Sequence, residues 1–263
     1  MNPKSIERAL DRYRAFKDED VRRRLAIFGP LILEAAAISN ELDDEDVVVE
    51  REPTADETIA ASKPNGTPLL RAGFVRINAD SFCRCAKHLG SVLLKSLELD
   101  EKLGSAPYCT EALVRTASEN PHGYLEAVVK LWDSGDADEA LLDIFVLPVL
   151  GETLRAYLTR FAEKASGLLE RSEEQKPSYS RTNTCFCCGS EPDIAAVVET
   201  TLRGNVKKLF CSTCGASWLY ERIRCVRCGN DVVSELTYIS DEADDMHRMH
   251  VCSKCGVAMP TLF

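Results

Sequence analysis

The chain has 263 residues, a hydrophobic fraction of 45% and a formal net charge of −10. This length can bury a sizeable core without disulfides, and the negative charge argues against a general nucleic-acid-binding protein. No apolar run approaches the roughly 18 residues of a membrane-spanning helix, so membrane insertion is not expected. The charged, amphipathic N-terminus is unlike a secretory signal, which predicts a cytoplasmic protein.

Helical periodicity dominates the first part of the chain. Residues 1–42 are predicted to be helical, with Pro30 expected to kink or divide the segment. The acidic, proline-containing stretch 43–68 is expected to form a loop or a partly disordered segment. Helix is predicted again at 79–100, where Phe82, Leu89 and Leu93 share a face and Asp80 or Ser81 could provide the N-cap.

Further helices are predicted at 109–118, 121–132, 137–147 and 150–170. Residues 171–184 lack apolar periodicity and indicate a linker. After it, β-branched segments such as IAAVVETT alternate with cysteine motifs. The pattern predicts an α+β protein with an all-α domain over 1–174, a linker over 175–184, and two small metal-binding modules over 185–219 and 220–263.

Nine of the twelve cysteines lie between Cys185 and Cys255, and eight of these form CxxC pairs, each followed at once by glycine. We call each pair with its glycine a knuckle. A CxxC turn directs two thiolates at one metal, and the next residue commonly needs a positive φ, which glycine accepts without steric cost. In a reducing compartment such a pattern indicates metal ligation and not disulfide bonding.

The spacing of the knuckles suggests how they pair. There are 22 residues between Cys188 and Cys211 and 23 between Cys228 and Cys252, but 10 between Cys214 and Cys225. The two similar gaps indicate a duplicated unit of knuckle, hairpin and knuckle. The predicted sets are Cys185, Cys188, Cys211 and Cys214 (site 1) and Cys225, Cys228, Cys252 and Cys255 (site 2). A cross-braced arrangement that joins the first knuckle to the third stays open.

Each predicted site is a closed tetrahedron of four sulfurs, which suits one zinc or one iron ion and leaves no open coordination position. We therefore expect structural metal ions and no Lewis-acid catalysis, and no catalytic or cofactor-binding motif is recognised elsewhere. Basic residues flank the knuckles, and we interpret them as counter-charges to the thiolates, although nucleic-acid contact is the alternative. They are Arg203, Lys207, Lys208, Arg222, Arg224 and Arg227.

Four other cysteines do not fit the repeated pattern. Cys187 lies between two expected ligands and is predicted to be exposed, with a spare, ligand-exchange or redox role left open. Cys83, Cys85 and Cys109 lie in predicted helix, where a free cysteine usually behaves as a small core residue. The nearby His88 does not complete a metal site with them.

Three segments together resemble the formate dehydrogenase accessory protein family: CFCCGSEPDIAAVV, LFCSTCGASWLYERIRCVRCGN and HVCSKCG. The resemblance covers about residues 185–256 and implies a helical domain followed by two rubredoxin-like modules. It also implies iron at the eight knuckle cysteines. Two features depart from the family: Cys187 in the first knuckle, and the absence of the helical tail that usually follows the last one.

The resemblance implies a non-catalytic maturation factor that binds the catalytic subunit of respiratory formate dehydrogenase and supports its assembly. Two alternatives come from other classes of protein: a zinc-ribbon nucleic-acid or transcription-associated protein, and a rubredoxin-like electron carrier. Nucleic acid is not the expected partner, and a homodimer stays open.

Overall fold

The computed structural model describes residues 2–99, 110–133, 141–175, 182–200, 204–242, 244 and 246–263. The chain forms two compact units: unit 1 comprises Met1–Glu50 and Val75–Arg160, and unit 2 comprises Arg51–Phe74 and Phe161–Phe263. Unit 2 thus combines the cysteine-rich sequence with two helical stretches from earlier in the chain. The α+β class is confirmed, while the sequence-based domain limits at 174 and 184 stay predictions.

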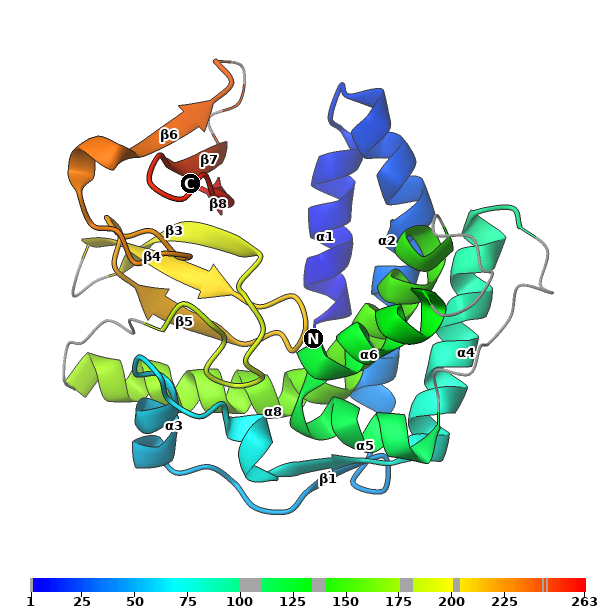
Figure 1. Ribbon diagram of the computed structural model, residues 1–263. Helices are drawn as coiled ribbons and strands as arrows, with labels where there is room; N and C mark the ends of the chain where they lie inside the picture. Colours follow the sequence, from blue (N-terminus) through cyan, green and yellow to red (C-terminus); the bar gives the residue numbers. More distant parts are fainter. Residues whose placement is uncertain are drawn as a thin grey trace. The chain divides into compact units, whose positions relative to one another are not determined.

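Unit 1 is mostly helical (Figure 1). Its helices are α1 (Pro3–Arg14), α2 (Glu19–Glu41), α4 (Ala79–Ser96), α5 (Glu111–Glu119), α6 (Pro121–Asp133) and the first part of α8 (Leu147–Gln175). A π-helical turn, Leu142–Val146, leads directly into α8. A short antiparallel pair, β1 (Val47–Val49) and β2 (Val75–Ile77), completes the unit.

The core of unit 1 is centred on three aromatic rings. Phe82 of α4 is fully buried and meets Tyr124 edge-on at 5.9 Å and Tyr157 at 5.4 Å between ring centroids. The Tyr157 hydroxyl lies 2.7 Å from Oγ of Ser81, which also donates to Asp46. The predicted apolar face of α4 therefore packs into the core as expected. The buried hydroxyl of Ser81, on the same helix, has hydrogen-bond partners.

Several predicted helix limits were wrong, and local capping explains two of them. The break in the first helical segment falls at residues 15–18, where the Asp18 side chain accepts from the N–H groups of Asp20 and Val21. Pro30 lies inside α2 and does not divide it. The N-cap of α4 is Asn78, whose side chain accepts from the N–H of Ser81.

The two helices predicted at 137–147 and 150–170 are joined in the part of the chain that the structure describes, because the π-helical turn continues into α8. Residues 137–140 and Cys109 lie outside the described residues. Helix α8 also extends to Gln175, so the first residues of the predicted 171–184 linker are helical.

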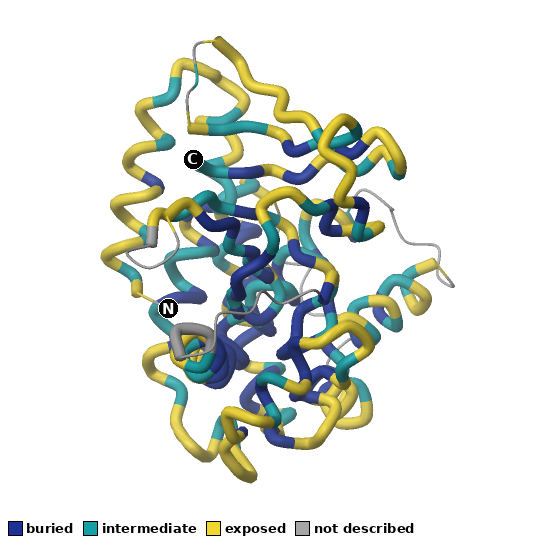
Figure 2. Tube along the Cα trace, turned by 90° about the vertical axis from the view of Figure 1, so that its left-hand side faces the viewer, coloured by how far each residue is buried: buried dark blue, intermediate teal, exposed yellow. Residues whose placement is uncertain are grey.

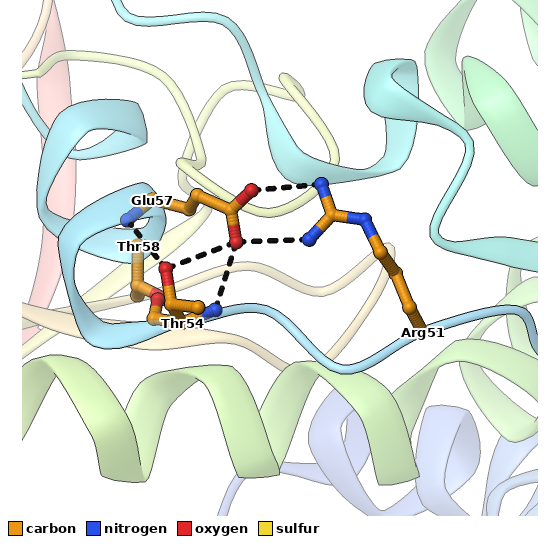
Figure 3. A network of polar contacts seen from close by, with 4 residues as sticks. All are labelled: Arg51, Thr54, Glu57 and Thr58. Atoms are coloured by element: carbon orange, nitrogen blue, oxygen red, sulfur yellow. Dashed lines mark hydrogen bonds and ion pairs between the residues drawn. The ribbon is translucent and has the colours of Figure 1, made fainter.

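Residues 43–68 are also more ordered than predicted, since they contain β1 and helix α3 (Ala55–Ala61). A capping box begins α3: Thr54 Oγ1 accepts from the N–H of Glu57, and the Glu57 carboxylate accepts from the N–H of Thr54 (Figure 3). Arg51 forms a bidentate ion pair with the same Glu57 carboxylate, with N···O distances of 2.7 and 3.0 Å. A polar sequence that reads as a loop is therefore fixed by its own side chains.

Replacing Thr54 by alanine is expected to lower the free energy of unfolding by about 1 kcal/mol, because it removes the side-chain cap of α3. Urea denaturation measures this loss. The exposed Thr67, which lies outside any helix, is the matched control, and its alanine variant should change stability by less than about 0.5 kcal/mol. Equal losses in the two variants would contradict a capping role.

The same capping box should respond to acid. The hydrogen-bonded guanidinium of Arg51 and the N–H of Thr54 lower the pKa of Glu57 to about 2. A carboxyl with a depressed pKa stabilises the folded state above its ordinary pKa, and this contribution is lost as the pH falls from about 4.5 towards 2. Glu57→Gln should therefore flatten the pH dependence of stability in that window.

Unit 2 contains one six-stranded sheet in the order β5-β4-β3-β8-β7-β6. Its strands are β3 (Ile194–Thr200), β4 (Gly204–Phe210), β5 (Ser217–Tyr220), β6 (Leu236–Ser240), β7 (His247–Cys252) and β8 (Ala258–Leu262). Strands β3, β4 and β5 form one antiparallel ribbon, and β6, β7 and β8 form another. A parallel pairing of β3 with β8, at Ala195↔Thr261 and Ala196↔Leu262, joins the two ribbons.

The second part of α8 packs against the first ribbon. Ser166 Oγ accepts a 3.0 Å hydrogen bond from the N–H of Ser217 in β5, and Glu170 lies 3.5 Å from Nζ of Lys208 in β4. At the other end of the sheet, β6 is exposed along its length after Leu236 (Figure 2). Among the described residues, no helix has both the length and the apolar character that crossing a bilayer requires.

Candidate metal centres

All four knuckles form the same turn. The N–H of each first cysteine donates to the carbonyl five residues later, at 2.7 to 3.0 Å, and the N–H of each glycine donates to the carbonyl of the first cysteine, at 2.8 to 3.1 Å. The glycines Gly189, Gly215, Gly229 and Gly256 have φ angles of 86°, 81°, 69° and 73°. The predicted need for positive φ is thus confirmed, because a side chain at these positions would strain the turn.

Site 1 is formed by the knuckle before β3 and the knuckle after β4. The Sγ atoms of Cys185 and Cys214 are 3.6 Å apart, and those of Cys188 and Cys211 are 3.5 Å apart. All four Sγ atoms lie within 4.8 Å of one another. A tetrahedral ion with metal–sulfur bonds of about 2.3 Å requires sulfurs about 3.8 Å apart, so the donor set fits zinc or iron.

Site 2 repeats this arrangement in the second ribbon, where one knuckle precedes β6 and the other lies between β7 and β8. The Sγ distances are 3.6 Å between Cys225 and Cys255 and 3.8 Å between Cys228 and Cys252. These four Sγ atoms also lie within 4.8 Å of one another. The structure therefore brings together both predicted sets, first knuckle with second and third with fourth. The spacings are far longer than the roughly 2.05 Å of a disulfide bond.

The thiols of site 1 already favour partial ionisation. Burial raises the pKa of Cys185 and of Cys214 well above the usual range. Hydrogen bonds from the neighbouring thiols of Cys185, Cys188 and Cys214 hold the pKa of Cys211 far below it. One thiolate is thus stabilised by its neighbours, and a divalent ion bound by these four cysteines would supply the charge needed to ionise the others.

A buried lysine lies between the two ribbons. Lys207 of β4 is fully buried, and its Nζ donates to the carbonyl of Arg224 at 2.7 Å and lies 3.5 Å from Nδ1 of His250. Burial lowers the pKa of Lys207 to about 8, against the attraction of Cys225 and Glu221. Its position beside site 2 agrees with the counter-charge interpretation.

Two of the other flanking basic residues face carboxylates, while Arg222 and Arg227 are exposed. Lys208 faces Glu170, and Arg224 lies 3.2 Å from Glu221 and 3.7 Å from Asp231. Arg203 lies outside the described residues. A basic surface for nucleic acid is not assembled from Lys207, Lys208 and Arg224.

Two polar residues at the sites were missed by sequence reasoning. Ser190 Oγ lies 3.4 Å from Sγ of Cys188, and Nδ2 of Asn230 lies 3.8 Å from Sγ of Cys252. Both are buried and occupy the same position, two residues after the second cysteine of a knuckle. The sequence repeat could have indicated them. The first and third knuckles have a polar residue at this position, whereas the second and fourth have alanine and valine.

Cys187 is not exposed as predicted but fully buried. Its carbonyl accepts a 2.9 Å hydrogen bond from the N–H of Leu70, and its thiol interacts with that of Cys214. Cys85 is buried in α4, where burial raises the pKa of its thiol to about 12, and Cys83 is half-buried. His88 pairs with Glu34 at 2.7 Å.

The chain was compared with known proteins. No family model matches it. It is 36% identical over 74 residues to an FdhE homolog from Aquifex aeolicus and 28% identical over 167 residues to an FdhE homolog from Pseudomonas aeruginosa. The chain is similar to FdhE homologs over these segments. The matches cover 28% and 60% of this chain but 26% and 51% of the relatives, so it spans about a quarter and about half of their lengths.

A solved structure of the FdhE protein from Pseudomonas aeruginosa has a TM-score of 0.47 and 19% sequence identity to this chain. That comparison covers 98% of this chain and 80% of the other. The sequence relatives confirm the family resemblance, and the two four-cysteine clusters lie in the region that carries it.

Proposed function

We propose that this chain is an accessory protein that binds the catalytic subunit of formate dehydrogenase and supports its assembly into active enzyme. The observation that carries the proposal is the joining of two four-cysteine clusters in one sheet, in a chain whose relatives are FdhE homologs. Each cluster is closed by four thiols, which suits a structural ion and leaves no site for a substrate. We place the protein in a reducing cytoplasm, where eight thiols remain available for metal.

The proposal assigns one metal ion, iron or zinc, to each site. Site 1 would hold it through Cys185, Cys188, Cys211 and Cys214, and site 2 through Cys225, Cys228, Cys252 and Cys255. The ions would hold the two ribbons in shape, because a small β module of this kind gains much of its stability from metal.

A nucleic-acid-binding function is the weaker candidate. Phosphate binding needs a cluster of accessible cations, whereas Lys207 is buried and Lys208 and Arg224 face carboxylates. Among the flanking basic residues that the structure describes, this leaves Arg222 and Arg227 exposed. The net negative charge of the chain also disfavours binding to phosphate groups. An electron carrier is also less favoured, because it would not require a large helical unit.

An anaerobic pull-down of tagged protein from its native organism grown with formate tests the proposal. We expect a formate dehydrogenase catalytic subunit to be retained through a moderate salt wash and identified by mass spectrometry. Recovery of ribosomal, polymerase or nucleic-acid material in its place would favour the zinc-ribbon alternative. Size-exclusion chromatography of the same sample reports whether the chain forms a homodimer.

A further inference from the structure

The two metal centres differ in how far the protein encloses them. At site 1 the four cysteines are between 0% and 1% exposed. At site 2, Cys225 and Cys252 are buried, but Cys255 is half-buried and Cys228 is exposed. Two sites with the same ligands and the same turn therefore present different surfaces to solvent.

The enclosure of site 1 comes from a distant part of the chain. Two backbone hydrogen bonds join the turn η1 (Leu69–Ala72) to the first knuckle. The N–H of Leu69 donates to the carbonyl of Phe186 at 3.0 Å, and the N–H of Leu70 donates to the carbonyl of Cys187 at 2.9 Å. Leu69 and Leu70 are 3% and 0% exposed. Pro68 lies so close to Gly189 that a Cβ there would approach its ring to 3.1 Å. We call residues 68–70 the cover of site 1.

The equivalent knuckle of site 2 has no such cover among the described residues. The carbonyl of Arg227, which corresponds to that of Cys187, accepts a 3.0 Å hydrogen bond from the exposed side chain of Asn183. At Gly229, which corresponds to Gly189, a Cβ would approach the guanidinium of Arg224 to 3.1 Å, so the nearest group there is a side chain adjacent to the same knuckle and not a distant turn. A Cβ on Gly256 would meet no atom within 4 Å, so the last knuckle borders open space. Two exposed apolar side chains, Val232 (48%) and Val233 (67%), follow the third knuckle after an interval of two residues.

We propose that site 2 is an exchangeable metal centre and site 1 a permanent one. The inference rests on the metal binding proposed above and is independent of the partner. With an ion held at site 2, an incoming thiolate from solution would bond to it in place of the exposed Cys228, whose released thiolate would take a proton from water. At site 1 the same exchange requires the cover to open first, which adds the free energy of local unfolding to the barrier.

Metal release from the purified full-length chain tests this proposal. The chain is loaded with two equivalents of Zn²⁺ and mixed with an excess of a chromogenic pyridylazo chelator. We expect one equivalent to leave roughly tenfold or more faster than the other. Release of both equivalents in a single phase would overturn the proposal.

Alkylation identifies which site opens. N-ethylmaleimide is added to the zinc-loaded chain, and the labelled cysteines are located by peptide mass spectrometry over time. Cys228 and Cys255 should be modified before any cysteine of site 1, and modification of Cys211 at the same rate would overturn the proposal. Cys83, which lies outside both sites, is the internal reference, because its labelling should not depend on metal.

A variant of the cover links the difference to its cause. Leu70→Ala removes a fully buried side chain over site 1 and should accelerate the slow phase of zinc release, leaving the fast phase unchanged. Unchanged slow release in a folded variant would refute the role of the cover. If the variant does not fold, the alkylation order in the unaltered chain decides the question. A failed pull-down of formate dehydrogenase would not affect either measurement.

Discussion

Replacing Cys211 by serine is expected to reduce the metal content from two ions per chain to one and to unfold the first ribbon. The hydroxyl cannot replace a thiolate ligand at site 1, where Sγ of Cys211 lies 3.5 Å from that of Cys188. Metal binding contributes on the order of 10 kcal/mol to folding in small four-ligand zinc domains, so the loss should be large. Inductively coupled plasma mass spectrometry measures the metal, and circular dichroism measures the fold.

Cys83→Ser is the matched control for this experiment. Cys83 is half-buried in α4 and belongs to neither cluster, so this variant should keep both ions. A folded Cys211→Ser chain that still binds two ions would contradict the ligand set of site 1. Loss of both ions would show that the ribbons joined through β3 and β8 depend on each other for metal.

Phe82→Ala is expected to lower the free energy of unfolding by about 3–5 kcal/mol, because it leaves a cavity between Tyr124 and Tyr157 in the core of unit 1. The metal content should stay at two ions, since both sites belong to unit 2. Guanidinium denaturation followed by tyrosine and tryptophan fluorescence measures the loss.

Ile144→Ala provides the comparison for the core variant, because the Ile144 side chain is 45% exposed. Its loss should stay within about 0.5 kcal/mol. A loss below about 1 kcal/mol in Phe82→Ala would mean that this aromatic cluster is not the centre of the core of unit 1.

The sequence predicted the parts of the fold that depend on neighbouring residues. The knuckles could be recognised because a CxxC-G turn needs its ligands and its glycine within five positions, and the 22- and 23-residue gaps match the hairpins β3–β4 and β6–β7. The amphipathic pattern of α4 likewise predicted the burial of Phe82, Leu89 and Leu93. Local geometry fixes both signals.

The parts that failed depend on contacts between distant residues. β1 is a three-residue strand that exists because it pairs with β2, and no periodicity over Val47–Val49 can indicate that partner. Cys187 was predicted to be exposed because the knuckle alone leaves it so, whereas the backbone of Leu70 covers it. The parallel pairing of β3 with β8 joins segments more than sixty positions apart and has no local signal.

The cover of site 1 is made well before the knuckle that it encloses. Leu70 leaves the ribosome 117 residues before Cys187, which at 5–20 residues per second is a delay on the order of ten seconds. During that time the N–H groups of Leu69 and Leu70 lack the carbonyls of Phe186 and Cys187 that accept their hydrogen bonds in the finished protein. The enclosure of site 1 by its cover is therefore a late, long-range step of folding.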